Sequence, residues 1–399
     1  MISIDDAKSL LFESVRPLKS KHEPATVCIG YILANDLYSD ISIPMFSQSA
    51  MDGYAVRVGD DALSGQERIT LPLKGEVQAG RYFKESMPPD SAVRIFTGAA
   101  VPGLARCVVR QEYVETDGQS ITISSKDIAN ENNIRPAGSQ IKKGDLALKK
   151  GSRLTPAAIG FLNTLGFSEV EVIRKPGSAI LSTGNELRKP GDELQPGEIY
   201  ESNSSMLKAA LRQSGFTAHT AEPVRDTTGE LKSSLKSLLN QFDVVITTGG
   251  ISVGKYDLVK QTLEKLGVEQ IFYKVKQKPG KPIYAGRKGN KLVFALPGNP
   301  ASALVCFYEY VLPSIKKMSG QPDFELPEKN TPLAHPFKMS DTRDIFFKAI
   351  VTDGKVTILG GQGSDMLQTF AGANALVLLP AGEKEYEPGD SVKTHLLPV

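Results

Sequence analysis

Three short segments of the chain combine glycine with small hydroxyl or amide side chains directly after an apolar run. They are residues 182–186 (STGNE), 247–252 (TTGGIS) and 296–302 (LPGNPAS). Glycine lets backbone N–H groups approach an anion, and Asn299 followed by Pro300 is typical of a helix N-terminus, which favours negative charge. The segments therefore predict a cradle for a phosphorylated ligand. Its predicted contacts are Thr183, Gly249, Gly250, Ser252, Pro297, Gly298, Asn299 and Pro300.

The second of these segments also fits a nucleotide-binding pattern. Residues 249–255 (GGISVGK) match the GxxxxGK spacing of a P-loop. A P-loop needs Ser or Thr at the next position to hold Mg²⁺, and this chain has Tyr256 there. The sequence therefore disfavours a P-loop NTPase, and Lys255 is interpreted as a solvated loop residue.

A strongly basic stretch runs from residue 271 to 291, with seven Lys or Arg and no acid. Lys274, Lys276 and Lys278 alternate, so they would project from one face if the segment is a strand, which outlines an anion site. The motif KPGKP then holds Lys278 and Lys281 between rigid prolines beside the glycine segments. The alternative is an exposed strand that lysines protect from edge pairing.

Three acidic residues follow predicted strands or begin predicted helices near the same edge: Glu186, Asp226 and Asp257. Carboxylates together with phosphate oxygens satisfy the octahedral shell of Mg²⁺, so these residues are candidate metal ligands. For Asp226 and Asp257 the alternative is helix N-capping alone. Far upstream, Asp52 and Gly53 lie in an apolar loop (PMFSQSAMDGYAV), where the alternative is a plain Asp-Gly turn.

The composition argues against several classes of protein. With 47 basic and 45 acidic residues the net charge is +2, which gives no reason to expect a nucleic-acid or membrane surface. The three cysteines are odd in number and far apart, which argues against disulfides and favours a reducing compartment. The four histidines show no metal-binding spacing, the N-terminus lacks a secretion signal, and no apolar run approaches ~20 residues. We expect a soluble, cytoplasmic protein.

The elements that must position these residues fall into several domains, because 399 residues are too many for one core. Strand and helix patterns alternate from about residue 177, which predicts a doubly wound, mostly parallel α/β sheet that binds ligands at the carboxyl ends of its strands. Valine- and threonine-rich runs earlier in the chain, with a hairpin at Asp117-Gly118, predict an inserted β domain, and short strands at the end predict a C-terminal β barrel. The predicted domains are 1–43 with 134–172, 44–133, 173–322 and 323–399.

Several segments together resemble the molybdopterin molybdenumtransferase family, MoeA, which is akin to the E domain of gephyrin. The resemblance rests on PMFSQSAMDGYA (44–55), RIFTGAAVP (94–102), STGNEL, ITTGGISVG, KPGKP and LPGNPAS, in this order over nearly the whole chain. It implies four domains, among them an α/β domain resembling the molybdopterin adenylyltransferases. It also implies the last step of molybdenum cofactor assembly, in which adenylylated molybdopterin and molybdate give the cofactor and AMP, with Mg²⁺ or a similar divalent ion.

The resemblance also implies roles for individual residues. The implied catalytic residues are Asp52, Thr97, Glu186, Asp226, Asp257, Lys274 and Lys278, with Pro297 and Pro300 also functionally important, and the cation ligands are Glu186, Asp226 and Asp257. The implied molybdate contacts are Lys278, Lys281, Ser302, Arg343 and Ser364. Many relatives have Arg two residues after this last Ser, where this chain has Met366, a departure that concerns the C-terminal part of the oxyanion site.

The resemblance further implies a homodimer in which the Asp52 loop of one subunit faces the α/β site of the other. A molybdopterin adenylyltransferase and molybdoenzyme-maturation proteins are candidate partners, whereas nucleic acid and membranes are not. Two other functions stay open: an adenylyltransferase that makes the adenylylated pterin, and a non-catalytic scaffold of the same fold. The two flanking β domains argue against the first, and the lack of long linkers or extra modules argues against the second.

Overall fold

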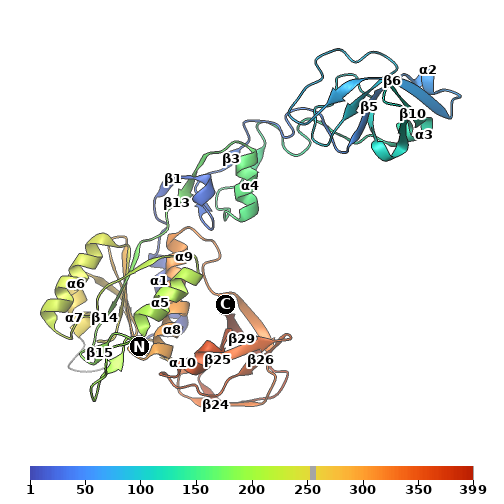
Figure 1. The fold of residues 1–399 in the computed structure, drawn as a ribbon. Helices are drawn as coiled ribbons and strands as arrows, with labels where there is room; N and C mark the ends of the chain where they lie inside the picture. Colours follow the sequence, from blue (N-terminus) through green and yellow to red (C-terminus); the bar gives the residue numbers. More distant parts are fainter. Residues whose placement is uncertain (252–257, 399) are drawn as a thin grey trace. The chain divides into compact units, whose positions relative to one another are not determined.

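A computed structural model describes residues 1–251 and 258–398 (Figure 1). The chain divides into two compact units. The first unit contains residues 1–34, 153–156 and 169–399, and the second unit contains residues 35–152 and 157–168. Within the described ranges, no helix is long and apolar enough to cross a membrane.

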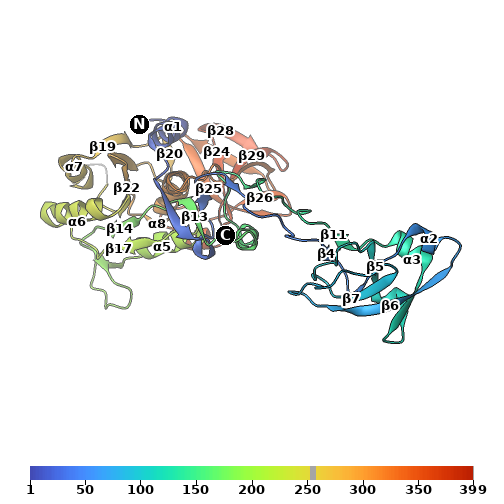
Figure 2. The same cartoon turned by 90° about the horizontal axis from the view of Figure 1, so that it is seen from above.

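The second unit is built around a six-stranded β sheet. Its elements are β3 (Leu37–Tyr38), β4 (Gln48–Ser49), β5 (Gly53–Arg57), α2 (Asp60–Leu63), β6 (Arg68–Val77), β7 (Ser91–Ile95), β8 (Cys107–Arg110), η2 (Gln111–Tyr113), β9 (Val114–Thr116), β10 (Ser120–Ser124), α3 (Ser125–Asn130), β11 (Ile134–Arg135) and β12 (Leu146–Leu148). The order is β8-β5-β7-β6-β10-β9, and Figure 2 shows β5, β7 and β6 together. Ile121 and Ile123 of β10 enter the core, because alternate strand residues share a face. The predicted hairpin is confirmed, since β9 and β10 pair across Asp117-Gly118.

Strands from both sides of the second unit in sequence pair within the first unit. β1 (Ser20–Pro24) pairs antiparallel with β13 (Glu169–Ile173), and β13 also pairs with β2 (Ile32–Leu33). The short helix η1 (Ala25–Val27) follows β1, and α4 (Pro156–Thr164) precedes β13. The chain therefore returns to its N-terminal strands after residue 168, as expected when one domain is inserted into another.

A second six-stranded sheet lies in the first unit, in the order β17-β14-β18-β22-β21-β19. The first four strands are parallel and the last two are antiparallel to their neighbours, which confirms a mostly parallel sheet. The strands are β14 (Ser178–Ser182), β17 (Ala218–Thr220), β18 (Val244–Thr248), β19 (Glu269–Tyr273), β21 (Tyr284–Lys288) and β22 (Lys291–Leu296), with the short pair β15 (Leu187–Arg188) and β16 (Ile199–Tyr200) beyond β14.

Helices cover both faces of this sheet (Figure 1). Ile180 of β14 lies in one hydrophobic cluster with α1, α5 and α8, whereas Ala179 and Leu181 lie in another with α6 and α7. Alternate strand residues point to opposite faces, so a strand buried on both faces is apolar throughout, and the doubly wound prediction is confirmed. The helices are α1 (Ile4–Ser14), α5 (Asn203–Gln213), α6 (Thr228–Gln241), α7 (Leu258–Lys265), α8 (Pro300–Cys306), η3 (Phe307–Val311) and α9 (Leu312–Met318).

One prediction for the basic stretch is wrong. β19 ends at Tyr273, and Lys274 has a φ of +64°, so residues 274 to 278 do not form one strand with alternating faces. Backbone pairing explains the break: Lys274 N–H donates to the carbonyl of Ile283, whereas Lys276 N–H donates to Ile2 at the N-terminus. The two lysines are thereby held by different partners.

The C-terminal part of the first unit forms a β domain. Its strands are β20 (Gln277–Lys278), β23 (Glu328–Pro332), β24 (Phe337–Asp341), β25 (Asp344–Thr352), β26 (Lys355–Ile358), β27 (Ala375–Leu379), β28 (Gly382–Tyr386) and β29 (Ser391–Leu396), with α10 (Leu367–Ala371). The sheet β20-β25-β27-β29-β23 and the pair β24-β28 share one core, because Met339 of β24 and Val377 of β27 lie in the same cluster. The predicted combination of α/β and β domains is confirmed. Notably, β20 belongs to the KPGKP region and pairs parallel with β25.

Candidate functional site

The three glycine segments begin at one edge of the α/β sheet. β14, β18 and β22 are neighbouring parallel strands, and Ser182, Thr248 and Leu296 at their carboxyl ends are in register. Backbone hydrogen bonds continue past the strands: Thr183 N–H donates to Thr248, and Gly249 N–H donates to Leu296. The loops therefore lie together at the edge where an α/β sheet binds its ligand.

Glycine is required in the middle loop by both backbone conformation and space. Gly249 and Gly250 have φ values of +87° and +63°. A Cβ atom on Gly249 would lie 2.2 Å from the carbonyl oxygen of Thr183, and one on Gly250 would lie 2.7 Å from Val259. Larger residues would separate the loops, so these glycines keep the backbone close-packed at the candidate phosphate cradle.

Two of the predicted metal-ligating acids line one pocket with these loops. Glu186 and Asp226 border a cavity of about 300 Å³ together with Thr183, Gly249 and Gly250. The Thr183 hydroxyl donates a 2.5 Å hydrogen bond to Asp226. The N-cap of α6 is Thr227, so the N-cap alternative for Asp226 is wrong. The predicted residues Asp257 and Ser252, and Lys255 and Tyr256 of the P-loop pattern, lie outside the described residues.

The third loop leads directly into a helix, as predicted. α8 begins at Pro300 with Asn299 at the N-cap position. The Asn299 amide does not cap the helix but donates a 2.7 Å hydrogen bond to the hydroxyl of Ser364 in the C-terminal β domain. The N–H of Ser302 donates to the carbonyl of the same serine. The loop is thus tied to a residue more than sixty positions away in sequence, which no local pattern indicates.

A second pocket, of about 310 Å³, brings together all five residues implied to contact molybdate. They are Lys278, Lys281, Ser302, Arg343 and Ser364. Pro297 and Asn299 also line this pocket, so it adjoins the cavity that contains Glu186 and Asp226. We call it the oxyanion pocket, because two lysines and an arginine with hydroxyl donors suit a small dianion.

One acid in the oxyanion pocket region was not singled out from the sequence. Asp341 lies 3.1 Å from the ammonium nitrogen of Lys278 and 3.4 Å from Nε of Arg343. Burial raises the pKa of this carboxyl, but the contacts with Lys278 and Arg343 outweigh burial and lower the pKa overall. Its sequence signal is weak: it is an acid two positions before the predicted arginine.

A buried lysine supports the loop that carries Ser364. Lys348 is 3% exposed, and its ammonium group donates to the backbone carbonyls of Gly361, Gly363 and Met366. Lys348 therefore holds the backbone of Met366 in place, while the side chain of Met366 is exposed. The sequence does carry a signal for Lys348, since it is one charge within the apolar run IFFKAIV.

A third pocket, of about 350 Å³, lies on the other side of Asn299. Glu186, Tyr200 and Glu201 contribute to its walls. Glu201 is buried and accepts 2.8 Å hydrogen bonds from the Ser182 hydroxyl and from the N–H of Ser204 at the start of α5. Sequence reasoning identified Glu186 but missed Tyr200 and Glu201, although the motif ESNSS places an acid directly before a helix.

Lys274 is not brought to these three pockets. Its ammonium nitrogen lies 4.5 Å from the ring centroid of Tyr273. The role that the resemblance implies for Lys274 stays a prediction.

Asp52 and Thr97 meet within the second unit. Asp52 Oδ1 accepts hydrogen bonds from the backbone N–H of Thr97, at 2.7 Å, and from its hydroxyl, at 2.8 Å. These bonds, the backbone one first, lower the pKa of Asp52 below its ordinary value. Pairing of β5 with β7, including Gly53 with Ile95, brings the two residues together.

Comparisons with known proteins agree along the whole chain. Family models match the MoeA N-terminal region (domain I and II) over residues 2–166, a probable molybdopterin binding domain over 179–317, and the MoeA C-terminal region (domain IV) over 330–397. The molybdopterin molybdenumtransferase of Haemophilus influenzae is 36% identical over 100% of both chains. Molybdopterin molybdenumtransferase 2 of Mycobacterium tuberculosis is 33% identical over 98% of this chain and 99% of its own.

A solved structure shows the same fold over its full length. The molybdopterin biosynthesis MoeA protein of Pyrococcus horikoshii matches with a TM-score of 0.82 and 31% identity, covering 100% of this chain and 99% of that one. The similarity therefore extends through all the domains and is not confined to the α/β sheet. On these matches, the chain belongs to the molybdopterin molybdenumtransferase (MoeA) family.

Proposed function

We propose that this protein inserts molybdate into adenylylated molybdopterin, releasing AMP and forming the molybdenum cofactor. The observation that carries the proposal is the oxyanion pocket, which lies beside the glycine loops and shares Pro297 and Asn299 with the neighbouring cavity. Relatives at 33–36% identity over nearly their full length bear the name of this activity. The adenylyltransferase alternative is not favoured, because full-length relatives bear the name of the transferase.

The oxyanion pocket and the neighbouring cavity bind different substrates in this proposal. Lys278, Lys281 and Arg343 supply positive charge for a tetrahedral dianion, and the hydroxyls of Ser302 and Ser364 can donate to its oxygens. The glycine loops offer backbone N–H groups to the phosphoanhydride of the adenylylated pterin. Attack on phosphorus by the oxygen of water or of molybdate breaks the bridging P–O bond, and AMP leaves. No protein nucleophile is needed, so the protein acts by holding both substrates in place and by charge.

A divalent cation fits the acidic side of the site. Glu186 and Asp226 face one cavity with the Thr183 hydroxyl, a set of oxygen ligands that Mg²⁺ prefers, and the resemblance adds Asp257. When bound, Mg²⁺ neutralises negative charge on the phosphoanhydride. In the described part of the chain, no three His, Cys, Asp or Glu side chains are grouped to hold a metal by themselves, so substrate oxygens and water would complete the shell.

The active form is proposed to be a cytoplasmic homodimer. Asp52 and Thr97 belong to the second unit, and in the proposed dimer they complete the site of the other subunit. The three buried, free cysteines support a reducing compartment. Sedimentation at micromolar concentration should show a dimer, and a species of only 43.1 kDa would contradict it.

The proposed reaction is tested with the purified protein, adenylylated molybdopterin, molybdate and Mg²⁺. AMP release should depend on molybdate and match the molybdenum recovered in the cofactor. If the protein instead converts free molybdopterin and ATP into the adenylate, it is an adenylyltransferase. If neither reaction proceeds, and Lys278→Ala still binds the molybdopterin adenylyltransferase or a molybdoenzyme-maturation protein as the unmodified protein does, the scaffold alternative holds.

A further inference from the structure

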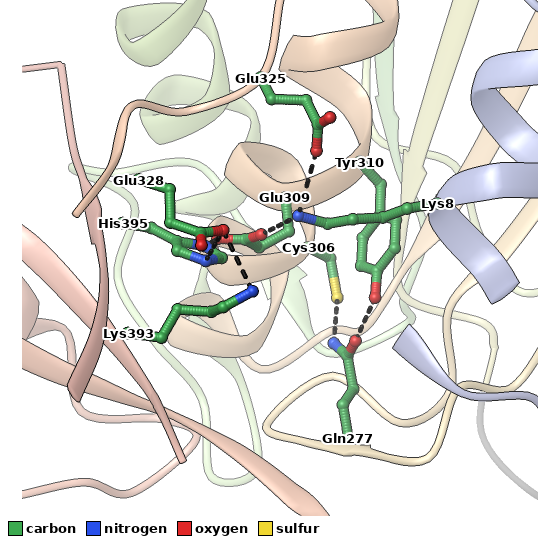
Figure 3. Close-up of polar contacts among 9 residues, drawn as sticks. All are labelled: Lys8, Gln277, Cys306, Glu309, Tyr310, Glu325, Glu328, Lys393 and His395. Atoms are coloured by element: carbon green, nitrogen blue, oxygen red, sulfur yellow. Dashed lines mark hydrogen bonds and ion pairs between the residues drawn. The ribbon is translucent and has the colours of Figure 1, made fainter. Parts of the chain in front are cut away.

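A π-helical turn interrupts the long C-terminal helix of the α/β domain beneath the oxyanion pocket. The turn is η3 (Phe307–Val311), between α8 and α9, and all of its residues are buried. Such turns widen the helix, change the direction of its side chains and occur frequently at functional sites. Two of its buried residues, Glu309 and Tyr310, carry polar groups that the proposed reaction does not use directly (Figure 3).

Tyr310 supports the loop that carries the two lysines. Its hydroxyl donates to the side-chain carbonyl of Gln277, and the amide of Gln277 donates a 3.0 Å hydrogen bond to the carbonyl of Pro279. Both side chains are fully buried, and burial raises the pKa of Tyr310 well above its ordinary value, so the hydroxyl remains a donor. A Cβ atom on Gly280 would lie 2.4 Å from Sγ of Cys306, which shows how closely the loop lies against α8.

Glu309 contacts a residue of the C-terminal β domain and a residue of α1. Its buried carboxylate lies 2.7 Å from Nζ of Lys8 on α1 and 2.8 Å from Nδ1 of His395 on β29. Burial raises the pKa of this carboxyl, but Lys8 and His395 outweigh burial and lower it, so Glu309 is the charged partner of Lys8. Further carboxylates lie farther off: Glu325 is 3.6 Å from Lys8, and Glu328 is 3.6 Å from the other ring nitrogen of His395.

The contact with His395 leads through the sheet to the loop that carries Ser364. His395 pairs with Leu376 of β27, and Leu376 pairs with Lys348 of β25, whose ammonium group holds the carbonyls of Gly361 and Gly363. One helical turn is therefore connected to two parts of the pocket: the loop of the two lysines through Gln277, and the loop of Ser364 through His395 and Lys348.

We propose that Tyr310 and Glu309 are positioning residues of the oxyanion pocket: Tyr310 holds the loop of Lys278 and Lys281, and Glu309, through His395, holds the strands that position the loop of Ser364. This inference rests on the proposed function. A tetrahedral dianion has a fixed size, so donors from two domains bind it together only when their spacing is fixed, and small displacements weaken such sites strongly. Two neighbouring residues on one buried turn can fix that spacing.

The first test uses Tyr310→Phe, Gln277→Leu and the double variant, assayed for AMP release at varied molybdate and at varied adenylylated molybdopterin. Each single variant should raise KM for molybdate about tenfold and leave KM for the pterin substrate unchanged. The double variant should keep the raised molybdate KM while its thermal stability recovers in part, because the two apolar side chains leave no polar group unpaired between them, although the carbonyl of Pro279 still lacks the bond from Gln277. The double variant therefore distinguishes an effect on molybdate binding from an effect on stability.

Tyr284→Phe is the matched control. Tyr284 is also fully buried, and its hydroxyl has no hydrogen-bond partner among residues 1–251 and 258–398, so removal of the hydroxyl should change neither KM. Lys278→Ala tests the pocket itself. If Lys278→Ala leaves the molybdate KM unchanged, the proposed oxyanion pocket is wrong; if it raises that KM and Tyr310→Phe does not, the function stands and the positioning role is overturned.

The second test addresses the loop of Ser364 through His395. His395→Leu removes the contact with Glu309 and should raise the molybdate KM about tenfold. His395→Asn can present an amide N–H near the position of Nδ1 and should restore most of the affinity. If both variants raise the KM values of both substrates equally, or only lower the amount of active protein, the contact is merely structural and the inference for Glu309 is overturned.

Discussion

The ammonium nitrogen of Lys278 lies 3.1 Å from a carboxylate oxygen of Asp341, so a proposed molybdate ligand already has a negatively charged partner. Asp341 also lies 3.4 Å from Arg343, which lines the oxyanion pocket as well. An incoming dianion must therefore compete with this carboxylate for both cations. The arrangement keeps the cations in place before the substrate arrives but weakens the substrate's binding.

Asp341→Asn should therefore bind molybdate more tightly. Lys278 is half exposed in this ion pair, so the pair is partly screened by solvent and its loss should change affinity by about two- to fivefold. Tungstate or molybdate titration at low ionic strength measures the change. Glu385→Gln, which breaks the exposed pair with Lys338 in the same β24-β28 sheet, is the control and should have no effect. Weaker binding by Asp341→Asn would show that the carboxylate favours oxyanion binding, for example by orienting the two cations.

Lys278→Ala should weaken oxyanion binding far more than Lys288→Ala. Lys278 lines the oxyanion pocket, whereas Lys288 donates a 2.8 Å hydrogen bond to the carbonyl of Leu266 on the other side of β21. A charge-assisted hydrogen bond contributes about 1.5–3 kcal/mol, which corresponds to roughly ten- to hundredfold in affinity. Equal losses for both variants in a molybdate titration would instead indicate a diffuse effect of the basic stretch.

The α/β sheet could be predicted from sequence because its signals are local. Apolar strands alternate with amphipathic helices, and each glycine loop follows its strand directly, so the carboxyl edge is defined before any long-range contact is known. The start of α8 at Pro300 follows in the same way. The failure at Lys274 has the opposite cause, because a period of two cannot show a residue with positive φ that pairs with Ile283.

The long-range contacts of the site could not be predicted from residue patterns. Asp341 meets Lys278 because β20 pairs with β25, a pairing between segments more than sixty residues apart. Asn299 has the sequence of an N-cap, yet its amide binds Ser364, because the C-terminal domain offers a partner there. The five molybdate contacts follow from resemblance to a family, and the lysine-rich stretch by itself leaves an exposed strand as the alternative to an anion site.

Thr97→Val should raise the pKa of Asp52. The variant keeps the backbone N–H bond and loses the hydroxyl bond, so the pKa should move toward its ordinary value without reaching it. Since the folded-state pKa is depressed, the stabilisation by this carboxylate is present above its unfolded-state pKa and is lost as pH falls through the folded-state pKa. In Thr97→Val the stabilisation should be smaller, and its loss should be complete at a higher pH.

Carboxyl NMR titration of the two proteins measures this shift. Asp117 is an internal control, because its pKa is lowered by hydrogen bonds from Ser120 and Gln119 in a hairpin that Thr97 does not contact. An unchanged midpoint for Asp52 would mean that the backbone bond alone sets its pKa.

Asp226→Asn should separate cation binding from folding. The amide oxygen of Asn can still accept the hydrogen bond from the Thr183 hydroxyl, and Asp226 is not the N-cap residue of α6, so the free energy of unfolding should change by less than about 0.5 kcal/mol. The variant nevertheless removes one of the two carboxylates that face the cavity with Glu186, and Mg²⁺ prefers charged oxygen ligands. AMP release measured over a Mg²⁺ series should therefore require roughly tenfold more Mg²⁺ for half-maximal rate. Glu230→Gln neutralises an acid four residues away, whose carboxylate accepts a 3.3 Å bond from the N–H of Arg225, and should leave the Mg²⁺ dependence unchanged. If Asp226→Asn follows the same Mg²⁺ curve as the unmodified protein, Asp226 only orients Thr183 and is not a ligand of the cation.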